Sequence, residues 1–461
     1  MSRFLLVLIV SVLGYQTLNA QNLNGKKLLK SVQKLEQNKQ YGEGIQLIQS
    51  NIDSTDKMFN QIVLKLVELQ VKLRLLDLAK INLSGIKNVS DVAVEAKSKE
   101  LSSEIEAQKN KYNTEVALGR KHVYDREFAK ANEAFQEALK YDTGNYEVWF
   151  RMGEQEHYTG SVQKAEELYK KSLKKHFDKE EGKSHVYVHL AEVYIIQRNF
   201  ESAVEMCDVA LKINKKEDEA LFIRGQALYF QGDYARASIN FTGFIKSNPK
   251  SILAYNMRGN CYMEMERYSS AIVDYSETLK LDSNMHDALS NRGRCYYFLK
   301  QYDKAIKDFD KMTESYDGNY KALNALGLCY YQKGNYKKAV YYFEQVTTIS
   351  SIEAYKFNLA ISYYRNNQFK LALRYFNELG ESRRNQPNYN VGHTWVLISL
   401  KQYEKARTWL DASMKMNPHV KEYYELSAEL YTKVGEKEKA EKELKIAHKI
   451  SGDALNFDPV F

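Results

Sequence analysis

One motif recurs at a fixed step of 34 residues through the middle of the chain, and it limits the possible fold more than any other feature. Four successive units carry an alanine at the same place, and a glycine lies twelve residues before each alanine. The alanines are Ala237, Ala271, Ala305 and Ala339, and the glycines are Gly225, Gly259, Gly293 and Gly327. A fixed period of this length indicates a repeat architecture in which each unit stacks on the next.

Aromatic residues surround each glycine and alanine at helical spacing. In all four units a tyrosine lies three residues before the alanine, and an aromatic residue lies four residues after it. This spacing predicts two amphipathic helices joined by a short turn. The small residues let the two backbones approach closely, while the aromatic side chains fill the remaining volume. Such a hairpin leaves an apolar face uncovered, so it needs neighbours.

This frame resembles the tetratricopeptide repeat, whose pattern is an aromatic residue, Leu-Gly, Tyr, Ala, a second aromatic residue and a late Pro. With Gly225 at repeat position 8, Pro249 and Pro418 both fall at position 32, where a second helix should stop. The resemblance implies an all-α fold, namely an α-solenoid superhelix of stacked antiparallel helical hairpins. Only four prolines and 22 glycines occur among the 461 residues, which agrees with an all-helical chain.

The repeat extends beyond its regular centre and gives the predicted domain organisation. Residues 112–454 are predicted to form about ten repeats, and residues 455–461 a tail. Residues 21–111 are predicted to be a degenerate repeat region that includes one long helix from Val92, although a separate helical cap fits these residues equally well. The one insertion lies between His176 and Lys183, which predicts a protruding loop or a lengthened helix.

Residues 1–20 are predicted to be a cleaved signal peptide. Arg3 supplies the positive start, an apolar run follows from Phe4 to Tyr15, and Leu18-Asn19-Ala20 resembles a signal-peptidase site. The alternative is an uncleaved amino-terminal anchor. A cleaved signal implies a periplasmic or secreted protein. No other apolar segment approaches the length of a membrane span, so we expect no integral membrane segment after cleavage.

The sequence offers no signature of catalysis. No glycine-rich phosphate loop, GxSxG elbow or Cys/His nucleophile motif occurs, so we expect no enzyme, no catalytic residue and no cofactor. The net charge of +8 is modest, and Lys and Glu are interspersed, which does not indicate a nucleic-acid partner. Cys261, Cys295 and Cys329 recur at one repeat position and are predicted to be buried core thiols.

Two histidines at helical spacing are candidate metal ligands. His185 and His189 are four residues apart, and Glu192 lies one turn further. The pattern HExxH is absent and no third ligand is assured, so no metal site is predicted. A small-ligand receptor or enzyme with its site at these histidines is the minor alternative.

The candidate binding residues follow from the resemblance. In members of this family the first helix of each repeat lines a concave groove, in which positions 2, 5, 9, 12 and 13 are exposed. The implied function is a non-enzymatic protein-protein interaction scaffold of the cell envelope that binds a peptide or helix of a protein partner. The predicted groove residues are Phe222, Gln226, Tyr229, Asn256, Asn260, Asn291, Arg294, Tyr297, Lys321, Asn324, Tyr331, Phe357 and Tyr364.

Two alternatives apply to this groove. The chain has 35 tyrosines, so any single aromatic residue of the row can instead be part of the core. The protein can also be a structural subunit of an envelope secretion, motility or outer-membrane assembly complex.

The family's carboxylate clamp matches this chain in part. Asn260, Asn291 and Lys321 occupy three of its places. Asn256 and Ala325 stand where the clamp has a lysine and an arginine, and the loss of two cations removes most of the charge-assisted bonding. Looser recognition of an anion is therefore favoured over a true clamp.

Overall fold

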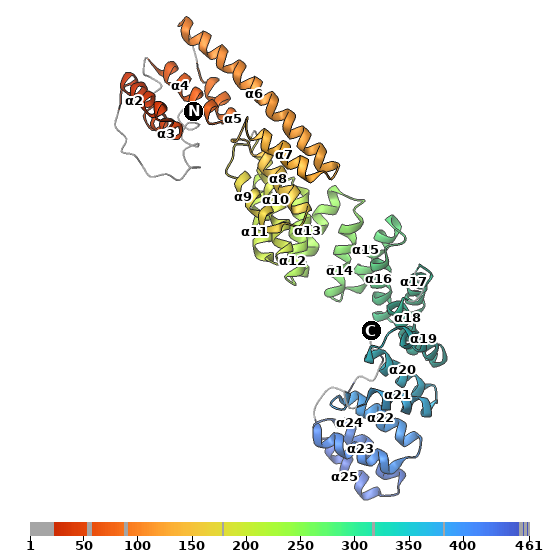
Figure 1. Cartoon of the computed structure of the whole chain (residues 1–461). Coiled ribbons are helices and arrows are strands. Elements are labelled where there is room, and N and C mark those ends of the chain that lie inside the picture. The colour runs from red at the N-terminus through yellow and green to blue at the C-terminus, as the bar shows by residue number, and fades with distance from the viewer. Residues whose placement is uncertain are drawn as a thin grey trace. The chain divides into compact units, whose positions relative to one another are not determined.

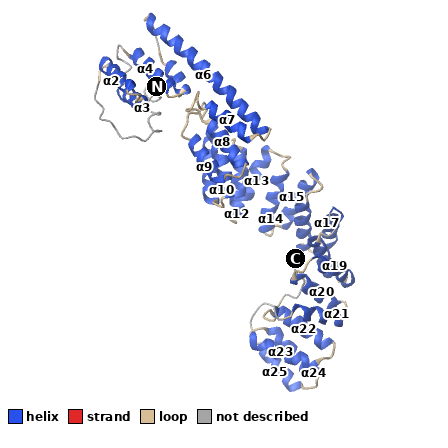
Figure 2. Ribbon diagram, viewed as in Figure 1, coloured by secondary structure: helices blue, strands red, loops and turns tan. Residues whose placement is uncertain are grey.

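The computed structural model describes residues 23–52, 58–86, 91–177, 179–315, 319–380 and 383–450, together with Leu455 and Pro459. Every regular element in this part of the chain is a helix (Figures 1 and 2). The predicted all-α fold of stacked hairpins is therefore confirmed. The predicted signal peptide lies outside the described residues.

The chain divides into two compact units at Ser247 and Asn248. The helices of unit 1 are α2 (Gly25–Gln37), α3 (Tyr41–Asn51), α4 (Phe59–Lys72), α5 (Leu76–Leu83), α6 (Val92–Tyr124), α7 (Phe128–Ala138), α8 (Glu147–Tyr158), α9 (Val162–Ser172), α10 (Glu181–Ile196), α11 (Phe200–Ile213), α12 (Asp218–Phe230) and α13 (Tyr234–Ser247).

The helices of unit 2 are α14 (Ile252–Glu264), α15 (Tyr268–Leu281), α16 (His286–Phe298), α17 (Tyr302–Ser315), α18 (Tyr320–Gln332), α19 (Tyr336–Ile349), α20 (Glu353–Arg365), α21 (Phe369–Leu379), α22 (Pro387–Ser399), α23 (Tyr403–Met416), α24 (Lys421–Lys433) and α25 (Lys437–Ala447).

Within each unit, consecutive helices pair as hairpins. From α6 onward the first helix of a hairpin is even-numbered and the second is odd-numbered, and each second helix packs on the first helix of the next hairpin of its unit. First helices also contact one another, as α8 contacts α10 and α14 contacts α16. The even-numbered helices therefore form one surface of each unit, which we call the first-helix face.

Each repeat glycine makes room for an aromatic ring from the second helix. A Cβ atom added at Gly327 would lie 2.6 Å from Cε1 of Phe343, a side chain that is fully buried. The same distance to the corresponding ring is 2.7 Å at Gly293 and 2.8 Å at Gly259. The glycine, rather than alanine, is thus required by close helix packing and not by a special backbone angle.

Replacement of Gly327 with alanine is therefore expected to destabilise unit 2 by about 1–3 kcal/mol, because the core must shift to admit the new methyl group. Thermal unfolding followed by circular dichroism would measure the loss. Gly42→Ala is the control, since nothing lies within 4 Å of a Cβ atom at that position. Equal melting temperatures for Gly327→Ala and the parent chain would contradict this account of the repeat frame.

The cysteines are core residues, as predicted. All four are unpaired and fully buried, and burial raises the pKa of each thiol to about 12. They are therefore protonated at neutral pH and are neither nucleophiles nor ready metal ligands.

The long helix α6 joins the amino-terminal hairpins to the repeats of unit 1. Its 33 residues pack against α4 and α5 through its first half and against α7 through its second half. A buried hydrogen-bond chain fixes this junction, because Tyr112 donates to Asn145 Oδ1 at 3.3 Å and Asn145 donates to Asp77 Oδ2 at 2.8 Å.

The start of the insertion between α9 and α10 packs against the fold. The His176 N–H donates to the carbonyl of Gly144 at 2.9 Å, and the ring of Phe177 stacks on Tyr146 with centroids 4.0 Å apart. The remaining extra length extends α10, which has 16 residues where α8 has 12. Of the two predicted alternatives, the lengthened helix is confirmed.

Beyond residue 450, the two described residues of the chain lie against the fold. The N–H of Leu455 donates to Oε1 of Glu422 at 2.7 Å, and Pro459 is buried.

Candidate peptide-binding face

A pocket of about 350 Å³ opens between neighbouring helices of unit 2. Its apolar floor comes mainly from α17 and α18, and its polar rim comes from α16 and α18. It is lined by Ser290, Arg294, Phe309, Met312, Lys321, Ala322, Asn324, Ala325 and Tyr355. The pocket thus includes three of the predicted groove residues, namely Arg294, Lys321 and Asn324.

Two cations meet at this pocket from successive first helices. Arg294 comes from the middle of α16, and Lys321 comes from the first turn of α18. Asn319 caps α18 by accepting a hydrogen bond from the N–H of Ala322 at 3.2 Å. The positive end of the α18 dipole therefore lies on the same side as both cations. The arrangement favours an anionic group above an apolar floor.

The predicted asparagines link neighbouring repeats to one another. Asn291 donates to Oδ1 of Asn260 at 3.1 Å, and that oxygen also accepts from Tyr275 at 2.7 Å. Asn358 donates to Oδ1 of Asn324 at 3.1 Å, with both side chains buried. The oxygen of Asn260 and one amide hydrogen of Asn291 are therefore engaged in contacts between repeats.

Three predicted groove side chains are not exposed. Asn256, Asn324 and Tyr331 are 7%, 2% and 5% exposed, so the expectation that these side chains are exposed is wrong, although Asn324 also lines the pocket. Tyr331 instead accepts a hydrogen bond from Nε of Arg365 at 3.2 Å. Position numbers from the family give a helix face, but the tilt of neighbouring helices decides which side chains of that face reach solvent.

The remaining aromatic residues of the predicted row in unit 2 are half-buried and packed on their neighbours. Tyr364 stacks on Trp395 with ring centroids 5.8 Å apart, Phe357 meets the ring of Phe376 edge-on at 6.1 Å, and Tyr297 meets Tyr302 at 5.6 Å. These rings contribute to the stacking of repeats as well as to the surface.

Unit 1 carries the three other predicted residues on α12. Phe222, Gln226 and Tyr229 are half-buried. The ring of Phe222 packs on Phe244 at 5.0 Å, and that of Tyr229 packs on Tyr234 at 5.3 Å. The structure brings none of these three into the pocket of unit 2.

Six of the nine lining residues are not among the predicted groove residues, and Ser290 and Tyr355 are two of them. Ser290 stands at repeat position 5, so the same position rule could have found it. Tyr355 is 9% exposed and lies against the ring of Tyr320 at 6.1 Å, and no positional signal separates it from the other core tyrosines.

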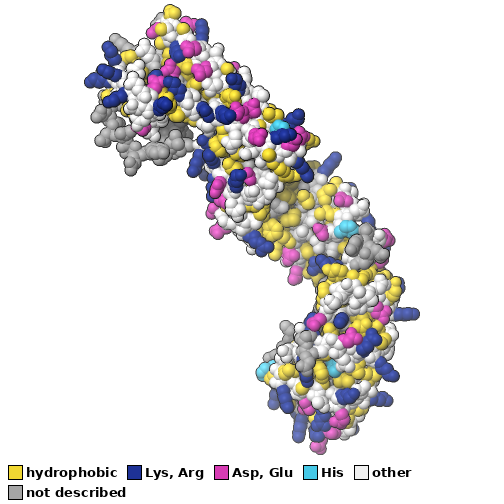
Figure 3. All heavy atoms as spheres, in the orientation of Figure 1, with side chains coloured by type: hydrophobic (Ala, Val, Ile, Leu, Met, Phe, Trp, Pro, Cys, Tyr) yellow, Lys and Arg dark blue, Asp and Glu magenta, His cyan; other side chains and the backbone are white. Residues whose placement is uncertain are grey.

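The charge on the visible surface is mixed. Figure 3 shows basic and acidic side chains interspersed over both units, with apolar side chains between them. The charged residues that line the pocket are Arg294 and Lys321.

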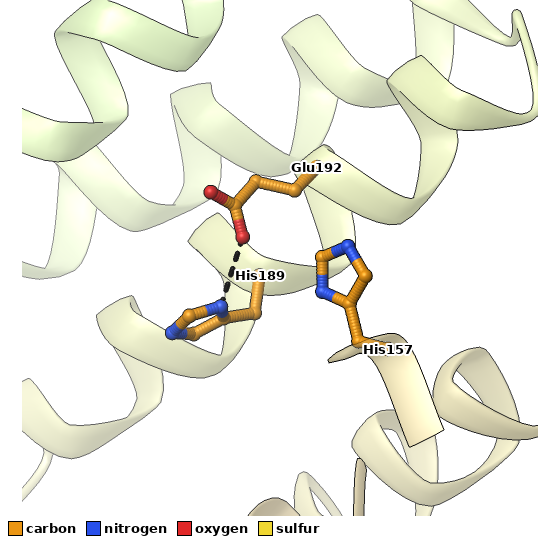
Figure 4. Close-up of side chains that lie close together, drawn as sticks. All are labelled: His157, His189 and Glu192. Atoms are coloured by element: carbon orange, nitrogen blue, oxygen red, sulfur yellow. Dashed lines mark hydrogen bonds and ion pairs between the residues drawn. The ribbon is translucent and has the colours of Figure 1, made fainter. Parts of the chain in front are cut away.

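Unit 1 contains a cluster of two histidines and a carboxylate on α8 and α10 (Figure 4). Burial lowers the pKa of His157. Burial also acts to lower the pKa of His189, but the hydrogen bond and charge of Glu192 outweigh it and raise that pKa. His185 lies four residues before His189 in the sequence, but its Nδ1 is 3.5 Å from Oε1 of Glu217, and its side chain is 57% exposed.

A second pocket of unit 2, of about 470 Å³, lies between α21, α22 and α23. His393 lines it and is 4% exposed, with Nε2 at 3.1 Å from Oδ1 of Asn377 and its ring 4.2 Å from that of Trp409. Burial lowers the pKa of His393 to about 4. Arg384, Glu404 and Lys405 are the charged residues of this pocket.

Acid is expected to destabilise unit 2 through His393. Its pKa is near 6.5 in an unfolded chain and about 4 in the fold, so the unfolded chain binds the proton more readily. The stabilisation is fully present above pH 6.5 and falls as the pH drops toward 4. The loss by pH 4.5 is roughly 2–3 kcal/mol. His393→Gln should show a smaller fall in melting temperature between pH 7.5 and 4.5 than the parent chain, and an equal fall would contradict this role.

Among the described residues, no helix is both long and apolar enough to span a bilayer.

Comparison with known proteins gives matches to one family in both units. Sequence models described as tetratricopeptide repeat match residues 116–178, 219–251, 252–285 and 284–351. The DnaJ homolog subfamily C member 7 homolog of Schizosaccharomyces pombe is 36% identical over 59 residues. That match covers 13% of this chain and 12% of the relative.

Solved structures of repeat proteins are also similar to parts of the chain. PilF of Pseudomonas aeruginosa is 14% identical, with 47% of this chain and 96% of PilF covered and a TM-score of 0.41. A tetratricopeptide repeat protein from Parabacteroides merdae is 18% identical, with 59% and 94% covered and a TM-score of 0.35. YrrB, a tetratricopeptide repeat protein with an unusual peptide-binding site, is 18% identical, with 41% and 95% covered and a TM-score of 0.34.

The family matches fall on helical hairpins that carry the Gly and Ala frame, with its aromatic rings packed on the repeat glycines. Residues 116–178 and 219–351 of this chain are therefore tetratricopeptide repeats.

Proposed function

We propose that this chain is a non-enzymatic scaffold that binds an acidic peptide segment of a partner protein in the pocket of Arg294 and Lys321. The main support for the proposal is that Arg294 and Lys321, from the successive first helices α16 and α18, line one pocket whose floor is apolar. Repeat proteins of this family bind protein or peptide partners, which supports a peptide as the ligand class.

The pocket suits a carboxylate with an apolar neighbour. A carboxylate between Arg294 and Lys321 gains charge-assisted hydrogen bonds, each of which contributes roughly 1.5–3 kcal/mol. Phe309 and Met312, which are 1% and 6% exposed, close the floor beneath it. An apolar side chain next to the carboxylate can cover this floor and exclude water from the ion pair.

The proposed place of action is the cell envelope. Its support is the signal-like start of the sequence, with Arg3, the apolar run and Ala20. Expression of the full-length gene in a bacterium with two membranes, followed by fractionation and amino-terminal sequencing, tests this part. A mature chain that begins at Gln21 and is released with the periplasm is the expected result, and an uncleaved chain in the cytoplasm would contradict it.

A peptide panel tests the ligand class. The full chain is probed with three sets of short peptides that share one apolar residue. The residue next to it has an acidic side chain in the first set, the corresponding neutral amide side chain in the second (the amidated set) and a basic side chain in the third. We expect retention of the acidic set, little retention of the amidated set and none of the basic set. Equal retention of the acidic and amidated peptides would contradict the proposal that the pocket recognises an anionic group.

A further inference from the structure

Two histidines and a glutamate converge on the first-helix face of unit 1. His157 comes from the last turn of α8, and His189 and Glu192 come from the middle of α10. Because residues three apart share one side of a helix, His189 and Glu192 face the same way, and His157 approaches them from the neighbouring hairpin (Figure 4). This site is separate from the pocket proposed to bind peptide.

The ligand atoms of the three side chains lie close enough for one ion. Each lies within 4.8 Å of the others, and Nδ1 of His189 is 2.9 Å from Oε2 of Glu192. Metal-ligand bonds of about 2.1 Å place two ligands of a tetrahedral ion roughly 3.4 Å apart. A side-chain movement of about 1 Å therefore completes the geometry, and the half-buried position of all three residues leaves a fourth place open to water.

A second carboxylate stands at the other nitrogen of His189. Oε1 of Glu154 lies 3.9 Å from Nε2 of His189, and Glu154 is itself held by Nη1 of Arg151 at 2.7 Å. When Nδ1 binds an ion, the ring proton resides on Nε2, where it faces Glu154. Such an outer carboxylate orients a histidine ligand and makes it more basic.

Aromatic packing holds the histidine rings in place. The ring of His189 lies 5.2 Å from that of Phe150 and 5.8 Å from that of Tyr169, which also meets His157 edge-on at 6.4 Å. Tyr169 is fully buried against Gly153, so this wall belongs to the repeat core. Rigid support of this kind is what a preorganised metal site needs.

We propose that His157, His189 and Glu192 bind a divalent transition-metal ion such as Zn²⁺, with Glu154 as the positioning residue for His189. Two imidazoles and one carboxylate are a ligand set that zinc accepts, and they come from two repeats. The bound ion would therefore link α8 to α10 and stabilise this part of unit 1.

Titration calorimetry with ZnCl₂ on the full, metal-stripped chain tests the site. We expect one Zn²⁺ per chain and at least 100-fold weaker binding in His157→Ala and in Glu192→Gln. Glu154→Gln should weaken binding by about 10–100-fold, the range for loss of an outer partner. His286→Ala, which removes an exposed histidine of unit 2, is the matched control and should bind as the parent does.

Two further measurements keep the outcome clear. Melting temperatures without metal show whether each variant folds. On addition of Zn²⁺, the parent and His286→Ala should gain the most stability, Glu154→Gln should gain less, and His157→Ala and Glu192→Gln should gain little. Co²⁺ titration should give the visible absorption of a tetrahedral site in the parent and lose it in His157→Ala. Absence of stoichiometric Zn²⁺ binding, or equal affinity in His157→Ala, would overturn the site.

Discussion

Replacement of Asp274 with alanine is expected to destabilise unit 2 by about 3–5 kcal/mol, the usual cost of leaving one member of a buried ion pair without its partner. Asp274 is 2% exposed and accepts two hydrogen bonds from Arg258, each at 2.7 Å. The hydrogen bond and charge of Asp274 raise the pKa of Arg258. A guanidinium stays protonated in proteins even without such a partner, so Arg258 remains charged when the aspartate is removed. Urea unfolding followed by circular dichroism would measure the loss.

An exposed ion pair supplies the matched control. Asp303 pairs with Lys333 in the same unit but is 80% exposed, so Asp303→Ala should cost less than about 1 kcal/mol. Replacement of both Arg258 and Asp274 by apolar residues should recover most of the stability, because no buried charge is then left unpaired. A cost for Asp274→Ala as small as that for Asp303→Ala would contradict this account.

Charge reversal at both Arg294 and Lys321 is expected to weaken binding of an acidic peptide by more than about 100-fold, since two charge-assisted contacts become repulsive. The affinity would be measured by fluorescence anisotropy with the tightest acidic peptide of the panel. Binding by the parent chain should also weaken as salt is raised, because the ions screen the pocket cations.

Lys337→Glu makes one of the same charge changes on an exposed residue of α19, outside the lining of the pocket. It should bind the peptide as the parent chain does. If Lys337→Glu weakens binding as much as the double reversal, the effect is one of net charge, and the pocket is not the binding site.

The fold could be predicted from the sequence because the repeat frame is a packing rule. Gly293 and Ala305 recur at one period since a fully buried ring, Phe309, must fit between two helix backbones. This packing rule decides which side chains of one hairpin lie between its two helices. The long helix α6 could also be predicted from the sequence, because its apolar residues keep helical spacing along the helix.

The candidate site could be predicted only in part, because it depends on how one hairpin meets the next. The sequence placed Arg294 and Lys321 on the same kind of face, and the structure brings them to one pocket. The sequence also placed Asn324 on this face. In the structure, its side chain is buried and accepts a hydrogen bond from Asn358 of the next repeat. Likewise, His157 is 32 residues from His189, so only the stacking of α8 on α10 makes them neighbours.

Hydrogen exchange of the full chain with and without the acidic peptide tests the central claim most directly. Amides of α16 and α18 around Arg294 and Lys321 should exchange more slowly when the peptide is bound, and the helices of unit 1 should be unchanged. Protection confined to unit 1, or no change in α16 and α18 at a saturating peptide concentration, would contradict the proposal that this pocket binds the partner.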